Sequence, residues 1–376
     1  MKSRMLKVIA FLFVLTTTIS YATNPTDDKK KKKQTIKVAL LLDTSNSMDG
    51  LINQAKTQLW EIVNELSYAK YGIQKPDLEI ALYEYGNDRL ESSDGYIRQV
   101  LSFSNDLDEI SEKLFSLTTN GGQEYCGQVI TSSLNQLKWG ANKDDLRLIF
   151  IAGNEAFTQG KINYQEAISD AKKKDVIINT IYCGDYNTGI SGKWKDGADL
   201  GGGDYMTINQ NKKIVHIITP YDNEIMILNK KLNKTYIYFG SQGFSRAEKQ
   251  RKQDDNAQNM SAPVSVKRTV SKSSRFYDNS VWDLVDKSKK ENIDYSKIER
   301  KKLPPKLREK TDTELKAYVE GQKKLRAEIT SKINELNKKR RAFIAQKQNE
   351  STKKNELENV MIKAIKKQAK KKNYSW

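Results

Sequence analysis

"TIKVALLLDTSNSMDG", residues 35–50, decides the fold of this chain. Its first nine residues form a continuous apolar and β-branched run of strand length, which is typical of a strand buried on both faces of a parallel sheet. The run ends in an acid, Asp43, and hydroxyl side chains follow at alternate positions, Ser45 and Ser47. Two interpretations stand here: these residues cap the helix that follows, or their oxygen atoms hold a metal ion.

Helical and strand patterns alternate beyond this stretch. Residues 48–70 place apolar side chains at spacings of three and four, which predicts an amphipathic helix. Strand patterns then cover 77–85, 96–104, 146–153, 176–184 and 201–209, and helical patterns cover 107–117, 125–139, 163–175 and 221–233. The short polar link between 85 and 96 predicts a hairpin. The alternation predicts an α/β domain with a doubly wound, mostly parallel sheet, in which ligands bind outside the carboxyl ends of the strands.

The first 22 residues have the pattern of a cleaved secretory signal peptide. Lys2 and Arg4 precede an apolar run at 8–15, which is far shorter than the roughly 20 residues that a membrane-spanning helix needs. The same length argues against the alternative of an uncleaved membrane anchor. No cysteine stands near residue 22 to carry a lipid. We therefore expect a periplasmic or secreted protein whose residues 23–34 form a lysine-rich spacer.

The net charge of +18 lies in the last third of the chain. Residues 1–240 carry 29 basic and 29 acidic side chains, whereas residues 241–376 carry 36 and 18. This contrast predicts a near-neutral domain at 35–240, a linker at 245–275 and a basic helical region at 276–376. The helical region could contact an anionic envelope surface. Nucleic acid is not an expected partner of an exported protein.

A long helix with one apolar stripe is predicted behind the capping-box sequence TDTE at 311–314. Such a stripe must pack against a neighbouring helix as in a hairpin, against a second copy of the chain, or against the α/β domain. The prediction is therefore an α-helical, partly coiled-coil-like extension with self-association as one of three alternatives.

"DTSNS", residues 43–47, resembles the first motif of von Willebrand factor A (VWA) domains, because it follows a buried strand and precedes an amphipathic helix. The order of strands and helices and the closing stretch "WKDGADLGGGDYMTIN" support the resemblance, which covers roughly 35–240. It implies a metal-ion-dependent adhesion site, usually for Mg²⁺, in which hydroxyls bind the ion directly and the aspartate acts through water. A vacant position would then accept a carboxylate from a partner.

Two departures from the family pattern change the expected ligand set. Where the family has a threonine after a glycine pair, this chain has "GGQEYCG", and where the family has an aspartate after the fourth strand, it has Gly153. The expected ligands of a divalent cation, Mg²⁺ in preference to Ca²⁺, are therefore Asp43, Ser45, Ser47, Glu124 and Asn154, with Gln123 and Glu155 as further candidates. The alternative is a metal-free domain in which residues 43–47 serve as strand-end and helix-cap groups.

Three other residues have weaker claims to function. His216, the single histidine, lies among apolar neighbours and is interpreted as a half-buried strand residue. Cys126 and Cys183 could form a disulfide in an exported protein or could remain two buried thiols. No serine nucleophile with a histidine partner is evident, so we do not expect an enzyme.

The sequence predicts an exported, non-enzymatic binding protein of the adhesion type. Its VWA-like domain would engage a protein partner at the carboxyl edge of the sheet through the variant metal site. The alternative is a structural or assembly protein of the cell envelope, in which the basic helices oligomerise or bind an anionic polymer and the VWA-like domain is a metal-free scaffold.

Overall fold

The computed structural model describes residues 33–209, 216–349 and 356–376. The predicted signal peptide and nearly all of the lysine-rich spacer lie outside the described residues. The described residues belong to one unit, 33–376. None of the helices within it has the length and apolarity that crossing a membrane requires.

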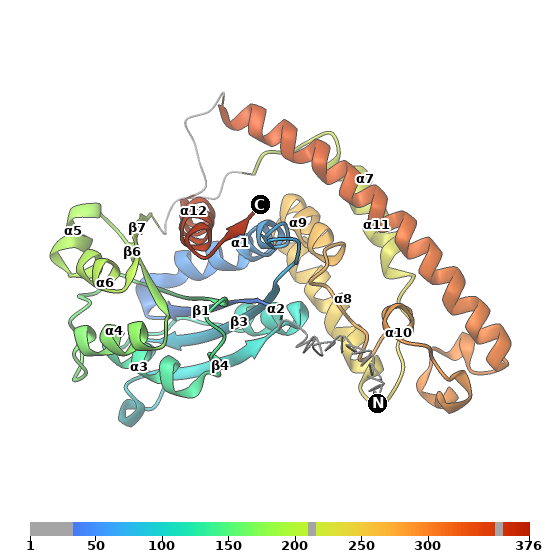
Figure 1. Cartoon of the computed structure of the whole chain (residues 1–376), viewed down its shortest axis with the longest axis horizontal. Helices are drawn as coiled ribbons and strands as arrows, with labels where there is room; N and C mark the ends of the chain where they lie inside the picture. Colours follow the sequence, from blue (N-terminus) through green and yellow to red (C-terminus); the bar gives the residue numbers. More distant parts are fainter. Residues whose placement is uncertain (1–32, 210–215, 350–355) are drawn as a thin grey trace, which may run out of the picture. The chain divides into compact units, whose positions relative to one another are not determined.

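A six-stranded sheet forms the centre of the α/β part, in the order β4-β3-β1-β5-β6-β7 (Figure 1). The strands are β1 (Thr35–Asp43), β3 (Asp77–Tyr85), β4 (Ile97–Ser104), β5 (Leu146–Gly153), β6 (Ile177–Cys183) and β7 (Gly202–Ile208). All neighbouring pairs are parallel except the β3–β4 hairpin. The bounds of β1, β3 and β5 coincide with the predicted ones, because long apolar runs are the clearest strand signal.

Helices cover both faces of the sheet, which confirms the doubly wound class. One face is covered by α1 (Asp49–Leu66), α2 (Leu107–Phe115) and α12 (Glu356–Lys371), and the other by α3 (Cys126–Gln136), α4 (Tyr164–Lys173) and α6 (Trp194–Leu200), with α5 (Tyr186–Ser191) beside α6. Helix α2 begins at the predicted place because the Asp106 carboxylate accepts hydrogen bonds from two backbone N–H groups of its first turn at 3.0 Å.

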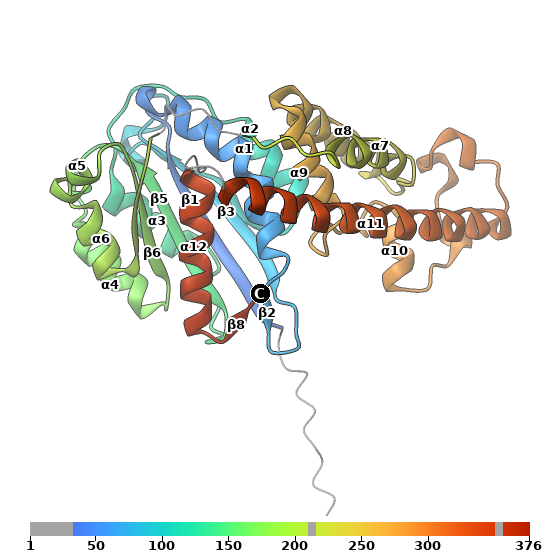
Figure 2. The same cartoon turned by 90° about the horizontal axis from the view of Figure 1, so that it is seen from above.

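The C-terminal end of the chain completes the α/β part, and packing against this part was one of the three alternatives predicted for the apolar stripe of the basic helices. Helix α12 packs beside α1 and over β7 (Figure 2), and Met361, Ile365 and Ala369 are buried in the same core cluster as the side chains of α1 and β1. The Gln368 side chain exchanges hydrogen bonds of 2.6 and 3.1 Å with Asn179 of β6. Beyond α12, β8 (Tyr374–Ser375) pairs with β2 (Lys70–Tyr71).

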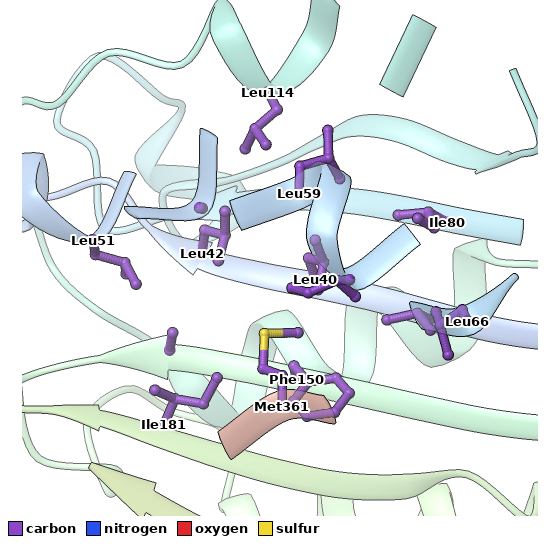
Figure 3. A pocket seen from close by; sticks show the side chains of 14 residues that line it. Leu40, Leu42, Leu51, Leu59, Leu66, Ile80, Leu114, Phe150, Ile181 and Met361 are labelled. Atoms are coloured by element: carbon purple, nitrogen blue, oxygen red, sulfur yellow. The ribbon is translucent and has the colours of Figure 1, made fainter. Parts of the chain in front are cut away.

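A small apolar cavity of about 30 Å³ lies where α1 and α12 meet the sheet (Figure 3). Figure 3 shows Met361 of α12 beside Phe150, and the other lining residues, among them Leu40, are apolar too. A space of this size without polar partners does not hold water. Met361 of α12 is therefore part of the dry core of the sheet domain.

The predicted domain end near residue 240 is corrected by the position of α7 (Asp222–Asn233). This helix was expected to close the VWA-like domain. Instead Ile225, Leu228 and Leu232 pack against α9 and α11 in a separate hydrophobic cluster. The described residues 216–349 thus form a helical insertion between β7 and α12, and α12 covers the sheet beside α1.

The predicted linker at 245–275 is wrong, because this stretch forms α8 (Gly243–Met260) and α9 (Ala262–Lys272). The two helices contact α2 and α1, and buried charged groups join them to each other and to α2: Arg268 of α9 pairs with Asp108 of α2 and with Asp254 of α8, and Lys272 of α9 also pairs with Asp254. A composition with few large apolar residues looked like a linker, but the structure buries ion pairs and smaller apolar side chains such as Ala257 and Val264 in these contacts.

Helices α10 (Leu284–Lys290) and α11 (Asp312–Asn349) complete the insertion. The capping box is confirmed: the Thr311 backbone N–H donates to the Glu314 carboxylate at 2.8 Å, and the Glu314 N–H donates to the Thr311 hydroxyl at 3.3 Å. The apolar stripe of α11 packs within this chain, against α7, α9 and α10. Self-association stays a prediction.

The disulfide alternative is wrong for Cys126 and Cys183, which are both free and buried. Cys126 belongs to the core on the α3 side of the sheet and Cys183 to the core on the α1 side, so the sheet separates them. Burial raises the pKa of both thiols. The second interpretation, two buried thiols, describes the structure.

Candidate metal centre at the carboxyl edge of the sheet

The polar residues of the first motif gather in the loop between β1 and α1. Asp43 is fully buried, and one of its carboxylate oxygens, Oδ1, accepts a hydrogen bond from the Ser45 backbone N–H at 2.7 Å. The hydroxyls of Ser45 and Ser47 lie 3.2 Å apart. No side-chain cap hydrogen bond from Ser45 is recorded for the short 3-10 turn that follows. The capping interpretation therefore does not account for these hydroxyls.

Glu124 faces Asp43 from the loop before α3. It is also buried, and one of its carboxylate oxygens accepts a hydrogen bond from the Glu155 backbone N–H at 3.3 Å. Burial, and after it the nearby Glu124 carboxylate, raise the pKa of Asp43 well above its ordinary value. Burial likewise raises the pKa of Glu124. Two acids thus share one water-poor space, an arrangement that favours either a proton or a cation between them.

Asn154 completes the group brought together at this edge. Its Nδ2 atom donates a hydrogen bond to the Ser47 hydroxyl at 3.1 Å. Glu155 is exposed, and its carboxylate accepts a hydrogen bond from Gln159 at 3.3 Å. Gln123 is exposed and no contact with the group is recorded for it, so the structure does not support this candidate. Of the seven predicted residues, five converge, Glu155 lies at the rim and Gln123 lies outside.

Two glycines make room for the facing acids. Gly86 has φ +76°, and a Cβ atom there would lie 2.8 Å from both the Asp43 carboxylate and the Glu124 side chain. At Gly153, where the family has an aspartate, a Cβ atom would lie 2.6 Å from the Tyr85 hydroxyl. That hydroxyl is fixed by a hydrogen bond of 2.9 Å to the Ala152 carbonyl. An acid at 153 has no space, and Glu124 supplies the second carboxylate from another loop.

Several supporting residues were missed by sequence reasoning. Asn87 donates to the Thr118 carbonyl at 3.1 Å, and the Asn120 N–H donates to the Thr44 carbonyl at 2.9 Å, which ties three loops together. The Trp194 indole N–H donates to the Glu155 carbonyl at 2.7 Å and fixes the fourth loop. No periodicity marks these positions, because each acts through a partner that is distant in sequence.

The residues present fit a divalent cation. The Oδ2 atom of Asp43 is buried and has no hydrogen-bond partner, so this acceptor lacks a donor or an ion. The converging groups offer two carboxylates, two hydroxyls and an amide, and these oxygen atoms are the ligands of hard cations such as Mg²⁺. Within the described ranges no cluster of three or more His, Cys, Asp and Glu side chains could hold a metal. A cation here would therefore depend on the hydroxyl and amide oxygens as well as the acids.

A mostly parallel sheet with an acid-and-hydroxyl loop at its carboxyl edge is the arrangement of the open α/β folds, in which this edge is the usual place for ligands. The family model of the von Willebrand factor type A domain matches residues 37–189. The chain contains a von Willebrand factor type A domain, as the resemblance of residues 43–47 predicted. No curated protein matches the sequence.

Solved structures resemble the chain at low identity. The SpRpn10 VWA domain has 16% identity and a TM-score of 0.36, covering 47% of this chain and 90% of that one. The protein BatB from Bacteroides thetaiotaomicron has 15% identity and a TM-score of 0.35, and the match covers 46% of this chain and 90% of that one. Proximal thread matrix protein 1 from the mussel byssus was solved in a form described as having a zinc-occupied MIDAS motif. It has 11% identity and a TM-score of 0.35, and the match covers 48% of this chain and 43% of that one.

His216 lies in an irregular segment before α7, not in the strand that was predicted, and it is half-buried as expected. Burial, with the nearby Lys267 and Arg340, lowers the pKa of His216 to about 4 from an ordinary 6.5.

Protonation of His216 therefore favours the unfolded chain, and we expect this group to reduce stability as the pH falls from 6.5 towards 4. Urea unfolding of the full chain at pH 7, 5.5 and 4.5 gives the free energy of unfolding at each pH. This free energy should decline less steeply with falling pH in His216→Gln than in the wild type. Equal slopes for variant and wild type would contradict this expectation.

Proposed function

We propose that this chain is an exported, non-enzymatic binding protein whose VWA domain engages a protein partner through a divalent cation. The cation would be held by Asp43, Ser45 and Ser47, with Glu124 and Asn154 from two further loops. The observation that carries the proposal is the pair of buried, facing carboxylates with an unsatisfied Asp43 oxygen beside two hydroxyls. Binding, and not hydrolysis, is supported by the content of the group, which contains no histidine or thiol.

Mg²⁺ is proposed in preference to Ca²⁺. The convergent side chains are short and few, and Mg²⁺ keeps several of its waters and needs only one or two carboxylates. Ca²⁺ usually takes six to eight oxygen ligands, often from bidentate carboxylates. When bound, the ion would supply an electrophilic position for an acidic side chain of the partner. A second acid in the site, Glu124, lowers the remaining positive charge, so we expect this pull to be weaker than in a site with one acid.

Cation titration of the full chain tests the proposal. Calorimetry with Mg²⁺, Mn²⁺ and Ca²⁺ should give saturable binding that Ser45→Ala and Ser47→Ala each weaken by about tenfold or more, because each removes an oxygen ligand. The full chain is needed, since a fragment ending at 240 would lack α12. Ser92→Ala, at an exposed serine in another loop, is the matched control and should bind as the wild type does.

Absence of saturable binding to all three ions would contradict the metal-dependent part of the proposal. So would unchanged binding in Asp43→Asn. Either result would favour the metal-free scaffold, and attention would move to the basic helices.

Asp43→Asn is expected to stabilise the chain in the presence of a chelator at pH 7. Because the pKa of Asp43 is raised in the folded state, folding is opposed increasingly as the pH rises above the ordinary value of 3.8, and the amide removes this charge. Thermal unfolding followed by circular dichroism should therefore show a higher midpoint for the variant in chelator and no further rise on adding Mg²⁺. A lower midpoint in chelator would mean that the carboxylate stabilises the metal-free fold.

A further inference from the structure

A cleft of about 520 Å³ lies on the α1 side of the molecule, away from the VWA site at the sheet edge. It is formed by the end of α1, the turn before β3, the end of α9 and the middle of α11, whose helices can be followed in Figure 1. The volume falls in the range of small-molecule sites, roughly 300–1,000 Å³. Four cationic side chains line it, Lys75, Arg275, Lys338 and Arg341, and none of its lining residues is acidic.

Arg275 brings a positive charge that forms no ion pair with a carboxylate of the described residues. Its guanidinium donates to three backbone carbonyls, those of Ser67 at 3.1 Å, Ala69 at 3.4 Å and Pro76. Burial lowers its pKa, and Asp77 offsets part of that effect. The groups that hold the guanidinium directly are neutral, and Asp77 offsets its charge only from a distance, so Arg275 adds positive potential to the cleft.

The remaining cations add to this excess. Within the described part of the chain, no hydrogen bond or ion pair is recorded for Lys75 or Lys338, and both are exposed at the mouth of the cleft. Arg341 stacks on the Tyr68 ring at 4.4 Å and pairs with Glu65 at 3.0 Å. Glu65 is shared with a second cation, Lys366, so one acid serves two bases.

Two hydroxyls of the cleft accept hydrogen bonds and leave their own O–H groups to donate. The Ser274 hydroxyl accepts from the Phe276 N–H at 3.3 Å, and the Tyr68 hydroxyl accepts from Asn337 at 3.2 Å. Among the described residues neither hydroxyl has a recorded acceptor. Cations and O–H donors thus face one concave space, and what the space lacks is an anionic acceptor with several oxygen atoms.

We propose that this cleft binds the phosphate group of a small anionic ligand, with Lys75, Lys338 and Arg341 contacting its oxygen atoms and Ser274 and Tyr68 donating hydrogen bonds to it. Guanidinium groups match the geometry of phosphate oxygens, and lysines act as mobile point charges around them. The site is independent of the VWA centre. The same chemistry recognises a soluble phosphorylated molecule and the headgroup of an anionic phospholipid, and the test separates these two sources.

The test uses the full chain, pyrophosphate as the soluble probe, and vesicles of phosphatidylcholine with or without phosphatidylglycerol. Calorimetry at about 50 mM salt should show one saturable pyrophosphate site per chain, since higher salt screens exposed charges. Lys75→Met/Lys338→Met should weaken binding by about tenfold or more, the loss expected when two charge-assisted contacts disappear. The control is Lys316→Met/Lys324→Met, which removes the same charge from exposed positions of α11 outside the cleft.

Selective loss of pyrophosphate binding in the cleft variant supports a soluble ligand. Binding to the phosphatidylglycerol vesicles alone, lost in the cleft variant and kept in the control, assigns the phosphate to a lipid headgroup. Equal losses in both double variants would overturn the proposal, because they would indicate general attraction by the basic surface. Failure of the wild-type chain to bind either probe would overturn it as well. All four substituted lysines are exposed, and thermal unfolding checks that the variants are folded.

Discussion

A chain that ends before α12 is expected not to form a stable α/β domain. Removing residues 356–376 uncovers the apolar side chains of β1, β5 and α1 that Met361, Ile365 and Ala369 bury. It also removes β8, the partner of β2. Exposed apolar surface on this scale destabilises by several kcal/mol, at roughly 25 cal/mol per Å². Expression of the truncated chain should therefore give aggregated or protease-sensitive protein.

A point change measures the same packing in a chain of full length. Ile365→Ala should lower the free energy of unfolding by about 2–5 kcal/mol, because Ile365 is buried and the cavity left behind cannot fill completely. Lys363→Ala, at an exposed position of the same helix, should change it by less than about 0.5 kcal/mol. Urea unfolding gives both values. Similar small effects for the two variants would mean that α12 is not part of the cooperative core.

Arg268→Met is the second change with a large expected effect. Arg268 is fully buried, pairs with Asp108 and with Asp254 at 3.0 Å, and stacks over the Trp60 ring at 4.6 Å. The methionine preserves much of the packing but leaves Asp108 buried without its cation. Breaking a buried pair in this way costs about 3–5 kcal/mol. We expect a loss of that size in the free energy of unfolding.

A matched control and a double variant separate charge from packing. Arg251→Met on α8 breaks an exposed pair with Glu248 and should cost no more than about 1 kcal/mol. Adding Asp108→Asn to Arg268→Met should recover part of the loss, since the unpaired buried charge is then gone. If the double variant were no more stable than Arg268→Met, the loss would come from packing and not from the ion pair.

The α/β class and much of the metal centre could be predicted from the sequence because their signals are local. Strands β1, β3 and β5 are continuous apolar runs, and residues 43–47 follow directly on one of them. Parallel strands end at the same edge, so Asn154 was expected to lie near Asp43 from topology alone. Glu124 was identified by its place after a glycine pair. Gln123, its neighbour, could not be excluded, because adjacent side chains in a loop point in different directions and the sequence does not show which of them faces the site.

The order of strands and helices, the VWA class and the oxygen-rich loop after β1 can thus be read from local patterns of a few to twenty residues. In contrast, the covering of the sheet by α12, the helices within 245–275 and the meeting of Lys75, Arg275 and Lys338 in one cleft become evident in the folded chain alone. These arrangements depend on contacts between segments that lie far apart in the sequence, such as that of Lys366 with Glu65, 301 residues away. An amphipathic helix shows that it must bury one face, and the surface that buries it is found only by folding the whole chain.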